Sequence, residues 1–437
     1  MRTELQKNAP HVYILIKTIS VSKMESVKDY GVYMTQKDNY SELVKRIKNK
    51  KIVITQSTIW DIAGSEIVTL ELATTLKRLG ADVLVFTWAL GGKMAKYFNE
   101  NNIDVTEDEN DVRFSDCDYV WVHHEAIPEY FIKLLSSSVK KPYFIFFHMS
   151  GLKQHYMEQP YLYNLEEQIA SRILFVSEEA RDNTEEYYFN HKLKNAQIFP
   201  NPAPDAFMDF TFKNKGLKKV LVVSNHPPRE LNSLNLGEDI KIDYMGEGKD
   251  TYSLLTPKKL KAYDVVITIG KTVQYCLCMG IPVYVYDRFG GPGYLNDKNF
   301  EKCAYANFSG RGFKKKTTEE IEREIVKGFD NAAMFESKNI AHNRERYGII
   351  GNLNRALQDL EKKKKVSDEF AKSLQATMCI VSWKFKHERR LRFVTENLNS
   401  ERDQLINVQK DLDNILSSKR YKMANALANI ANKIRRR

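Results

Sequence analysis

Short apolar runs alternate with longer amphipathic segments through most of this chain. The first cycle begins at Lys51, where KIVIT has strand length and strand composition. Gly64 and Ser65 then begin a segment with apolar residues at helical spacing, which ends at Gly80. Further strand-like runs follow at 81–88, 103–105, 118–122, 142–147 and 172–177. Because parallel strands need crossover connections, strands that alternate with helices predict a parallel, doubly wound α/β sheet.

A second series of the same kind follows an interruption that contains three prolines, FPNPAPD at Phe199–Asp205. Thr317 and Glu320 have the spacing of a capping box, which predicts a helix that runs to about Phe329. The sequence therefore predicts two Rossmann-like domains and further segments. The strand-like runs of the second series are 219–224, 241–245, 265–269 and 283–286, and the expected division is an appendage at 1–50, a first domain at 51–200, a linker at 201–216, a second domain with a return helix at 217–360 and a helical extension at 361–437.

The helical extension has a heptad pattern and a basic end. Leu391, Leu398, Leu405 and Leu412 are seven residues apart, and Val394, Val408 and Ile415 take the complementary position, with only Glu401 out of place. Such a seam either packs on the chain's own globular part or forms a homo-oligomeric coiled coil. From Ser417 onward the chain has basic residues and no acid, with apolar residues along one helical face. This end is either a solvated tail or a basic amphipathic helix that binds an anionic membrane surface.

Composition narrows the class of protein. The chain has 437 residues and a formal net charge of +11, which indicates an anionic partner. Five scattered cysteines are typical of reduced thiols, and no apolar run is long enough to span a membrane. We therefore expect a cytoplasmic protein that lies on the inner face of the cell membrane. Nucleic acid is disfavoured as a partner because the basic residues concentrate at the end of the chain, without a recognition motif.

Ligands of open α/β sheets bind beyond the carboxyl ends of the strands, so the loops after each apolar run hold the candidate residues. Lys271 and Thr272 begin a helix directly after Gly270, an arrangement that presents backbone N–H groups and a cation to a phosphate. Together with Lys271, Arg229 would supply the cation pair that a diphosphate leaving group needs without a metal. The candidates in chain order are Gly64, Ser65, His123, His124, Glu125, His148, Asn225, His226, Arg229, Gly246, Glu247, Gly270, Lys271 and Thr272.

The histidines and one acidic motif have simpler alternatives. His148, at the end of an aromatic strand, is either a core histidine or a catalytic, sugar-contacting residue. His123 and His124 are adjacent, so at most one of them faces a site. Asp116-Cys117-Asp118 matches a metal-binding DxD pattern but precedes its strand, at the wrong end for the site. We therefore predict neither a metal nor a cofactor.

Five short segments, in this order and spacing, resemble those of GT-B glycosyltransferases, most closely glycosyltransferase family 4. They are Gly64-Ser65-Glu66, Phe199-Pro200-Asn201-Pro202, Gly246-Glu247-Gly248, Asp264 and Gly280-Ile281-Pro282-Val283. The resemblance implies two Rossmann-like domains that face a central cleft, with the nucleotide-diphosphate sugar held mainly by the second. It implies that Arg229 contacts the donor phosphates and that His148 lies near the transferred sugar. It further implies metal-independent transfer of a hexose or related sugar to a glycan or lipid-linked acceptor, in cell-surface polysaccharide synthesis.

One departure from the family pattern concerns the donor helix. Family 4 enzymes carry a pair of glutamates there, whereas 270–275 of this chain contains no acid. Gln274 is the candidate for the ribose contact, and Gly290 and Gly291, in the glycine-rich segment 287–293, are candidates for the sugar contact. The alternatives are a nucleotide-sugar epimerase or hydrolase of the same architecture, and a noncatalytic partner subunit.

Overall fold

The computed structural model describes residues 39–435 except 138, 140, 154, 156, 157, 248–250, 363 and 364. Most of the expected appendage at 1–50 lies outside this range, while residues 39–47 are helical. The chain forms two units, of which the first ends at Cys379 and the second is Ile380–Arg437.

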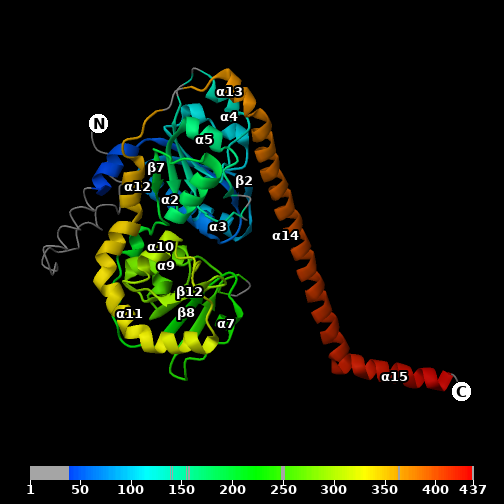
Figure 1. Cartoon of the computed structure of the whole chain (residues 1–437). Helices are drawn as coiled ribbons and strands as arrows, with labels where there is room; N and C mark the ends of the chain where they lie inside the picture. The colour runs from blue at the N-terminus through cyan, green and yellow to red at the C-terminus, as the bar shows by residue number, and fades with distance from the viewer. Residues whose placement is uncertain are drawn as a thin grey trace, which may run out of the picture. The chain divides into compact units, whose positions relative to one another are not determined.

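The first domain is built on a seven-stranded sheet in the order β3-β2-β1-β4-β5-β6-β7, and every pair is parallel (Figure 1). Side chains on both faces of the central strands are buried, among them Ile52, Val53 and Ile54 of β1. Burial on both faces explains why these strands are continuous apolar runs in the sequence. The strands are β1 (Lys51–Ile59), β2 (Asp82–Leu90), β3 (Asp104–Thr106), β4 (Tyr119–His123), β5 (Tyr143–His148), β6 (Ala170–Phe175) and β7 (Ala196–Ile198).

Helices connect these strands as the alternating pattern predicts. The helix expected from Gly64 is α2, and its buried residues include Val68, Leu72 and Leu76, which recur at helical spacing. The helices and turns of this domain are α2 (Gly64–Arg78), α3 (Gly92–Glu100), η2 (Glu109–Asp111), η3 (Phe114–Asp116), α4 (Phe131–Leu135), α5 (Tyr163–Ile169), α6 (Glu178–Thr184) and η5 (Glu185–Phe189).

The second domain has a five-stranded sheet in the order β12-β11-β10-β8-β9. Its first four strands in the chain pair in parallel, whereas β12 is antiparallel to β11. The elements are η6 (Asp205–Phe207), β8 (Lys219–Val223), α7 (Arg229–Asn232), β9 (Lys241–Met245), α8 (Pro257–Leu260), β10 (Val265–Thr268), α9 (Lys271–Met279), β11 (Val283–Asp287), β12 (Gly290–Tyr294) and α10 (Phe300–Tyr305).

The segment 287–293 is a hairpin and not the open loop that its glycines suggested. A Cβ atom on Gly291 would lie 2.0 Å from the carbonyl oxygen of Val285, and one on Gly290 would lie 2.7 Å from that of Lys314. The glycines therefore let backbones pack closely within the edge of the sheet.

The helix predicted from the capping box is α11 (Thr318–Tyr347), and both hydrogen bonds of the box are present. The expected end at Phe329 is wrong, because Ala332, Ala333 and Glu336 continue the buried face of the helix for several further turns. After α11, α12 (Ile349–Leu357) returns the chain to the first domain (Figure 1). Arg46 donates to the carbonyl of Leu357 at 3.3 Å, and Arg172 donates to that of Gln358 at 2.6 Å.

The second unit begins later than the expected residue 361. The backbone N–H of Val366 donates to the carbonyl of Leu135 at 3.3 Å, and Sγ of Cys379 lies 3.2 Å from a carboxylate oxygen of Glu129. These contacts hold α13 (Asp368–Ser373) and the start of α14 in the first unit.

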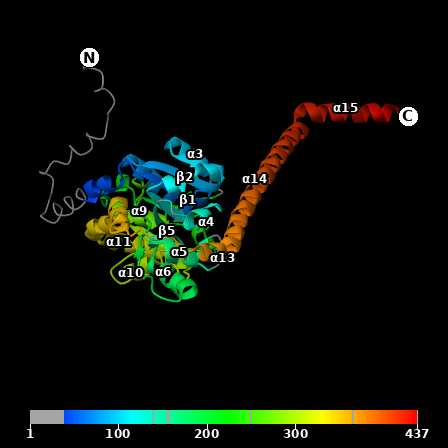
Figure 2. The ribbon, with the colours of Figure 1, turned by 90° about the horizontal axis from the view of Figure 1, so that it is seen from above.

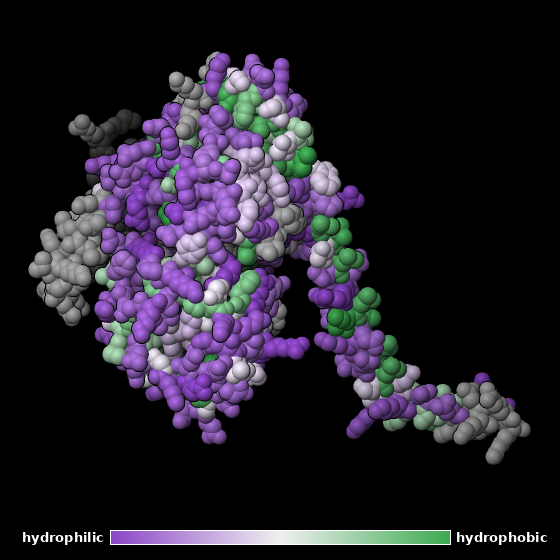
Figure 3. Space-filling model, viewed as in Figure 1, coloured by the Kyte–Doolittle hydropathy of each residue, from purple (hydrophilic) through white to green (hydrophobic). Residues whose placement is uncertain are grey.

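The second unit consists of the rest of α14 (Gln375–Ser417) and of α15 (Lys419–Arg435). Figures 1 and 2 show two straight helices with a bend between them. Apolar side chains along α14, among them Leu398 and Leu405, are exposed, and Figure 3 shows a series of them on the helix surface. Among the residues that the structure describes, no helix is both long enough and apolar enough to cross a membrane.

Candidate active site

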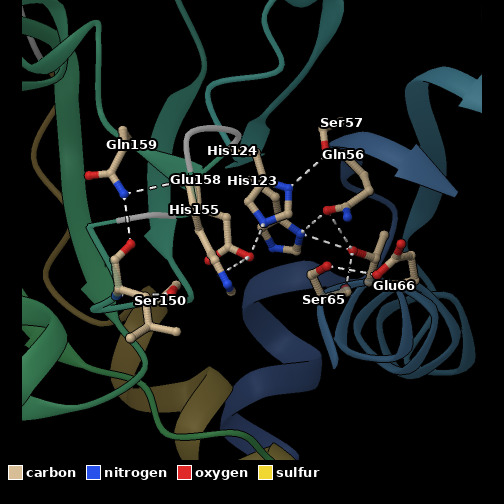
Figure 4. Close-up of polar contacts among 12 residues, drawn as sticks. Gln56, Ser57, Ser65, Glu66, His123, His124, Ser150, His155, Glu158 and Gln159 are labelled. Carbon is tan, nitrogen blue, oxygen red and sulfur yellow. Dashed lines mark hydrogen bonds and ion pairs between the residues drawn. The ribbon is translucent and has the colours of Figure 1, made fainter. Parts of the chain in front are cut away.

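Polar side chains gather where β1 and β4 end in the first domain (Figure 4). Nδ1 of His123 lies 2.9 Å from Oγ1 of Thr69 on α2 and 3.3 Å from Oε1 of Gln56 on β1. Burial lowers the pKa of His123 well below its ordinary value, and the neighbouring His124 lowers it further to a smaller extent. His123 is therefore a neutral histidine that links the sheet to α2.

The adjacent His124 points elsewhere, as expected for neighbouring residues. Its backbone has a φ of 53°, in the left-handed region. Nδ1 lies 2.8 Å from Oγ of Ser57, and Nε2 lies 3.9 Å from a carboxylate oxygen of Glu158. Of the two histidines, only His124 reaches the loop that contains Glu158.

Glu158 has a strongly shifted pKa, and it is not among the residues that the sequence predicts for the site. Figure 4 shows this side chain beside His124 and His155. Its Oε1 atom lies 3.9 Å from a ring nitrogen of each, and the side chain is 20% exposed. Burial raises the pKa of Glu158 to about 7, against the lowering effects of a hydrogen bond with Ser150 and of the charge of His148. The residue lies ten positions beyond the end of β5, so a search of the first residues after each strand does not reach it.

His148 ends β5, as the strand pattern predicts. Its ring stacks on Phe175 with the centroids 5.1 Å apart, and Nε2 lies 2.8 Å from Oε2 of the fully buried Glu166. Glu166 therefore fixes the orientation of the imidazole. The contact with a transferred sugar stays a prediction, and it would have to use the rest of the ring.

The loop after β1 contacts the loops after β8 and β9. Nδ2 of Asn225 donates to the carbonyl of Ile62 at 3.3 Å, and Oδ1 of Asn225 accepts from the N–H of Glu247 at 3.3 Å. The hydroxyl of Tyr252 also accepts from the N–H of Ile62, at 3.0 Å. A Cβ atom on Gly246 would lie 1.8 Å from the carbonyl oxygen of Ser224, so only glycine fits there. The carboxyl edges of the two sheets therefore face each other, and Gly248, the last residue of the Gly-Glu-Gly turn, lies outside the described residues.

Two helices start with glycines that face open space, α2 at Gly64 and α9 directly after Gly270. Gly270 has φ 61° and ψ −135°, a conformation that other residues rarely adopt. Ser65, next to Gly64, donates from its hydroxyl to Glu66 at 2.7 Å. Thr272 is half-buried in the first turn of α9, and Arg229 is exposed at the start of α7.

The side chain of Lys271 does not lie where a phosphate contact was expected. Its Nζ atom lies 2.6 Å from Oε2 of Glu71 on α2 and donates to the carbonyl of Pro202 at 2.9 Å. The hydroxyl of Tyr275 also donates to Glu71. Burial raises the pKa of Glu71 and lowers that of Lys271. In this structure the ammonium group joins the two domains and does not face an open phosphate site.

Gln274 is likewise turned inward. It is 1% exposed, and its amide lies 3.1 Å from Oδ1 of Asn307, which also accepts from Asn201 at 3.1 Å. These amides join α9 to the proline-rich linker. The expected contact of Gln274 with a ribose stays a prediction. Gly290 and Gly291, the candidates for the sugar contact, pack closely against the backbone of Lys314 and Val285.

The acidic motif at 116–118 has a structural role. The carboxylate of Asp118 accepts from the N–H of Lys51 at 3.2 Å, at the amino end of β1. Across the described residues, no group of three or more His, Cys, Asp or Glu side chains could hold a metal ion. All five cysteines are free thiols.

Comparison with known proteins gives structural matches only. No protein-family model and no curated protein matches the sequence. Three similar solved structures are a glycosyltransferase from Rickettsia africae ESF-5 (13% identity, 71% of this chain and 97% of that chain, TM-score 0.47), WaaG, a glycosyltransferase involved in lipopolysaccharide biosynthesis (11%, 71% and 99%, 0.41), and UDP-GlcNAc 2-epimerase from Neisseria meningitidis bound to UDP-GlcNAc (11%, 70% and 97%, 0.40). The sheets themselves confirm the predicted fold of two Rossmann-like domains with a C-terminal helical extension.

Proposed function

We propose that the chain is a glycosyltransferase that moves a hexose or related sugar from a nucleotide-diphosphate sugar to a glycan or lipid-linked acceptor. One observation carries this proposal: the loops that follow the parallel strands of the two sheets meet at Ile62, Asn225 and Tyr252. In open α/β sheets that edge is where ligands bind. Two such edges face to face suit a reaction between two substrates, one held by each domain.

The donor belongs to the second domain in this proposal. Gly270 leaves space at the start of α9, where backbone N–H groups and the helix dipole favour a phosphate. Arg229 is exposed at the start of α7, and the guanidinium groups of Arg288 and Arg311 lie 4.9 and 5.9 Å from the ring centroid of Phe289. Cations and N–H groups of this kind stabilise a departing diphosphate without a metal ion.

The acceptor belongs to the first domain, beside Gly64, Ser65, His124 and His148. Lys271 reaches a donor phosphate only if its ion pair with Glu71 opens, so donor binding would be linked to a movement between the domains. We assign the chain to the group that resembles glycosyltransferase family 4, with a role in cell-surface polysaccharide synthesis.

The basic end supports a location on the inner face of the cell membrane. Lys419, Arg420 and Lys422 begin α15, and the apolar side chains of Met423 and Leu427 are 66% and 64% exposed. A helix with exposed apolar side chains and a basic first turn suits the headgroup layer of an anionic membrane. This placement would bring the enzyme to a lipid-linked acceptor.

The seam of α14 supports a homo-oligomer. Leu398, Leu405 and Leu412 are 59%, 69% and 47% exposed, and Val408 between them is 64% exposed. A seven-residue repeat of this length matches the period of a partner helix. A second copy of this chain is the partner that we propose.

A noncatalytic subunit is the second candidate, because the segment 270–275 has no acid and its Gln274 is buried. The test is to incubate the protein with UDP-, GDP- and dTDP-sugars and to measure release of the nucleotide diphosphate with and without glycan acceptors. Release that depends on an acceptor supports transfer. Release without an acceptor indicates a hydrolase, and thermal stabilisation by a nucleotide without release indicates the noncatalytic subunit.

A further inference from the structure

An exposed tryptophan lies on the first turns of α14, outside the two Rossmann-like domains. Trp383 is 64% exposed, and Ile380, one turn before it, is 67% exposed. The ring of Trp383 stacks on that of His387, one turn after it, with the centroids 5.1 Å apart and 11° between the planes. Because residues three and four positions apart share one side of a helix, these three side chains form a single surface, the Trp383 face. Adjoining exposed apolar side chains of this size mark a contact with another molecule.

The heptad seam of α14 does not explain this exposure. Leu391 and Val394 are the first two residues of the seam, and the same positions one heptad earlier are Lys384 and His387. A lysine and a histidine there interrupt the apolar repeat that a partner helix would need. Trp383 falls on neither position of the seam. The Trp383 face therefore needs a partner other than the helix proposed for the seam.

Positive charge surrounds the Trp383 face. The segment 384–392 contains a single acid, Glu388, and its carboxylate accepts from Nε of Arg392 at 3.0 Å. Lys386 and Arg390 are exposed, three and seven residues after Trp383, and so lie on the same side of the helix. The basic residues of the segment are Lys384, Lys386, Arg389, Arg390 and Arg392. An anionic surface is therefore the partner that the charges of this face attract.

An anionic membrane suits this combination better than a nucleic acid does. Tryptophan is enriched where a bilayer meets water, because its ring is apolar and its N–H group bonds to polar groups. Lysine and arginine beside it add attraction to acidic headgroups. A nucleic-acid base would stack on the indole ring, but His387 already covers one of the two faces of Trp383. Ile380 adds apolar surface, which a bilayer buries and a phosphate backbone does not.

We propose that the Trp383 face is a membrane contact, in which Trp383 and Ile380 enter the headgroup layer of an anionic bilayer while Lys386 and Arg390 bind its acidic headgroups. This inference goes beyond the proposed transferase activity and adds a second contact to the one proposed for α15. The part of α14 that follows Trp383 spans roughly 50 Å at about 1.5 Å per residue. Two contacts joined by this helix bind one membrane more tightly than either contact alone.

The fluorescence of tryptophan tests this contact directly. The chain has four tryptophans, and Trp60, Trp88 and Trp121 are buried in the first domain, so a change in emission on adding vesicles reports on Trp383. The probes are vesicles of phosphatidylcholine with phosphatidylglycerol, and vesicles of phosphatidylcholine alone. We expect the emission of the full chain to move to shorter wavelength with the anionic vesicles only, and to be quenched when their lipid chains carry bromine. Trp383→Phe loses both responses.

Co-sedimentation with the same vesicles measures affinity. We expect Trp383→Ala to weaken binding about 10-fold or more, because burial of a large apolar side chain contributes about that factor, while Trp383→Phe stays near wild type. Glutamine at Lys386 and Arg390 weakens binding roughly 20-fold at low salt. Glutamine at Lys327 and Lys338, which are exposed on α11, removes the same charge and leaves binding near wild type.

The emission also separates the Trp383 face from α15. Glutamine at Lys419, Arg420 and Lys422 should keep the shift with anionic vesicles at low salt, and loss of the shift in this variant overturns the proposal. Unchanged emission of the wild type with anionic vesicles overturns it too, whether or not the chain co-sediments. A shift caused by raising the protein concentration without lipid would assign the face to a second copy, and a shift with single-stranded DNA alone would assign it to nucleic acid. No donor sugar is used, so a chain without transferase activity gives the same result.

Discussion

The ammonium group of Lys271 lies 2.6 Å from the carboxylate of Glu71, across the boundary between the two Rossmann-like domains. Both groups are withdrawn from solvent, with side-chain exposures of 6% and 14%. Tyr275 adds its hydroxyl to the same carboxylate. This pair holds the domains together at the position where the sequence pattern predicts a phosphate contact.

Breaking this ion pair from one side should destabilise the protein strongly. Removal of one partner of a buried pair leaves the other charge without compensation, which costs about 3–5 kcal/mol. We expect this loss for Glu71→Gln and for Lys271→Met in urea unfolding, and a smaller loss for the double variant. Lys338→Met is the control, because Lys338 and Asp297 are 3.9 Å apart with 71% and 75% exposure. A loss below about 1 kcal/mol in both single variants would show that the pair contributes little.

Glu336 should make stability fall as the pH rises. Burial raises the pKa of this side chain well above 4.5, and its Oε2 atom has no hydrogen-bond partner. The folded state therefore keeps a proton that the unfolded state releases above pH 4.5. The free energy of unfolding then decreases by about 1.4 kcal/mol per pH unit until the pH exceeds the folded-state pKa.

Glu336→Gln removes this dependence, so the variant should gain stability relative to wild type as the pH rises above 5. Urea unfolding between pH 5 and pH 8 measures the difference. A difference between variant and wild type that stays constant across this range would contradict the assignment.

Gly270 should be needed for donor binding and not only for folding. An alanine at φ 61° and ψ −135° costs roughly 1–3 kcal/mol of strain and changes the start of α9. Gly237→Ala is a matched control, since Gly237 has φ 94° and also faces open space. We expect both variants to lose stability, while only Gly270→Ala loses thermal stabilisation by UDP, GDP or dTDP. Equal nucleotide binding by the two variants would show that the donor phosphate does not bind at the start of α9.

The start of α15 should control membrane binding. Replacing Lys419, Arg420 and Lys422 by glutamine removes about 1 kcal/mol of attraction per residue, or roughly 100-fold in affinity together. Co-sedimentation with vesicles that contain anionic lipid, at low and at high salt, measures this change. Glutamine at Lys258, Lys327 and Lys338, which lie on the second domain, controls for net charge. Equal binding by the two triple variants would show that α15 is not the membrane contact.

The α14 seam should set the oligomeric state. Leu405→Lys places a charge in the middle of the proposed helix interface, whereas Asn407→Lys adds the same charge outside the seam. We expect sedimentation equilibrium to show a larger assembly for wild type and for Asn407→Lys, and a monomer for Leu405→Lys. A monomeric wild type would show that the α14 seam does not bind a second copy of this chain.

The sequence predicts the sheets of this fold better than it predicts the site. Buried parallel strands are continuous apolar runs, so the sequence predicts eight of the first nine strands, all except β7, together with α2 and the capping box of α11. The hairpin at β12 was missed because Gly290 and Gly291 are typical of loops, and only the tertiary contact with Val285 and Lys314 explains them.

The site residues depend on contacts between distant segments. Lys271 follows a strand and a glycine as a phosphate-binding lysine would, but Glu71, 200 residues earlier in the chain, determines where its ammonium group lies. Glu158 acquires its pKa from burial and from Ser150, and neither effect is visible in sequence spacing. The sequence indicates which charged residues and loops are candidates for the site. Which of these side chains contact each other is determined only by the folded structure.

The most direct test of the proposed transferase activity is the mass of an acceptor after incubation with the protein and a nucleotide-diphosphate sugar. We expect a gain equal to one glycosyl residue, with one nucleotide diphosphate released for each acceptor modified. Donor turnover that leaves the acceptor mass unchanged, or no turnover with any donor and acceptor combination, would contradict it.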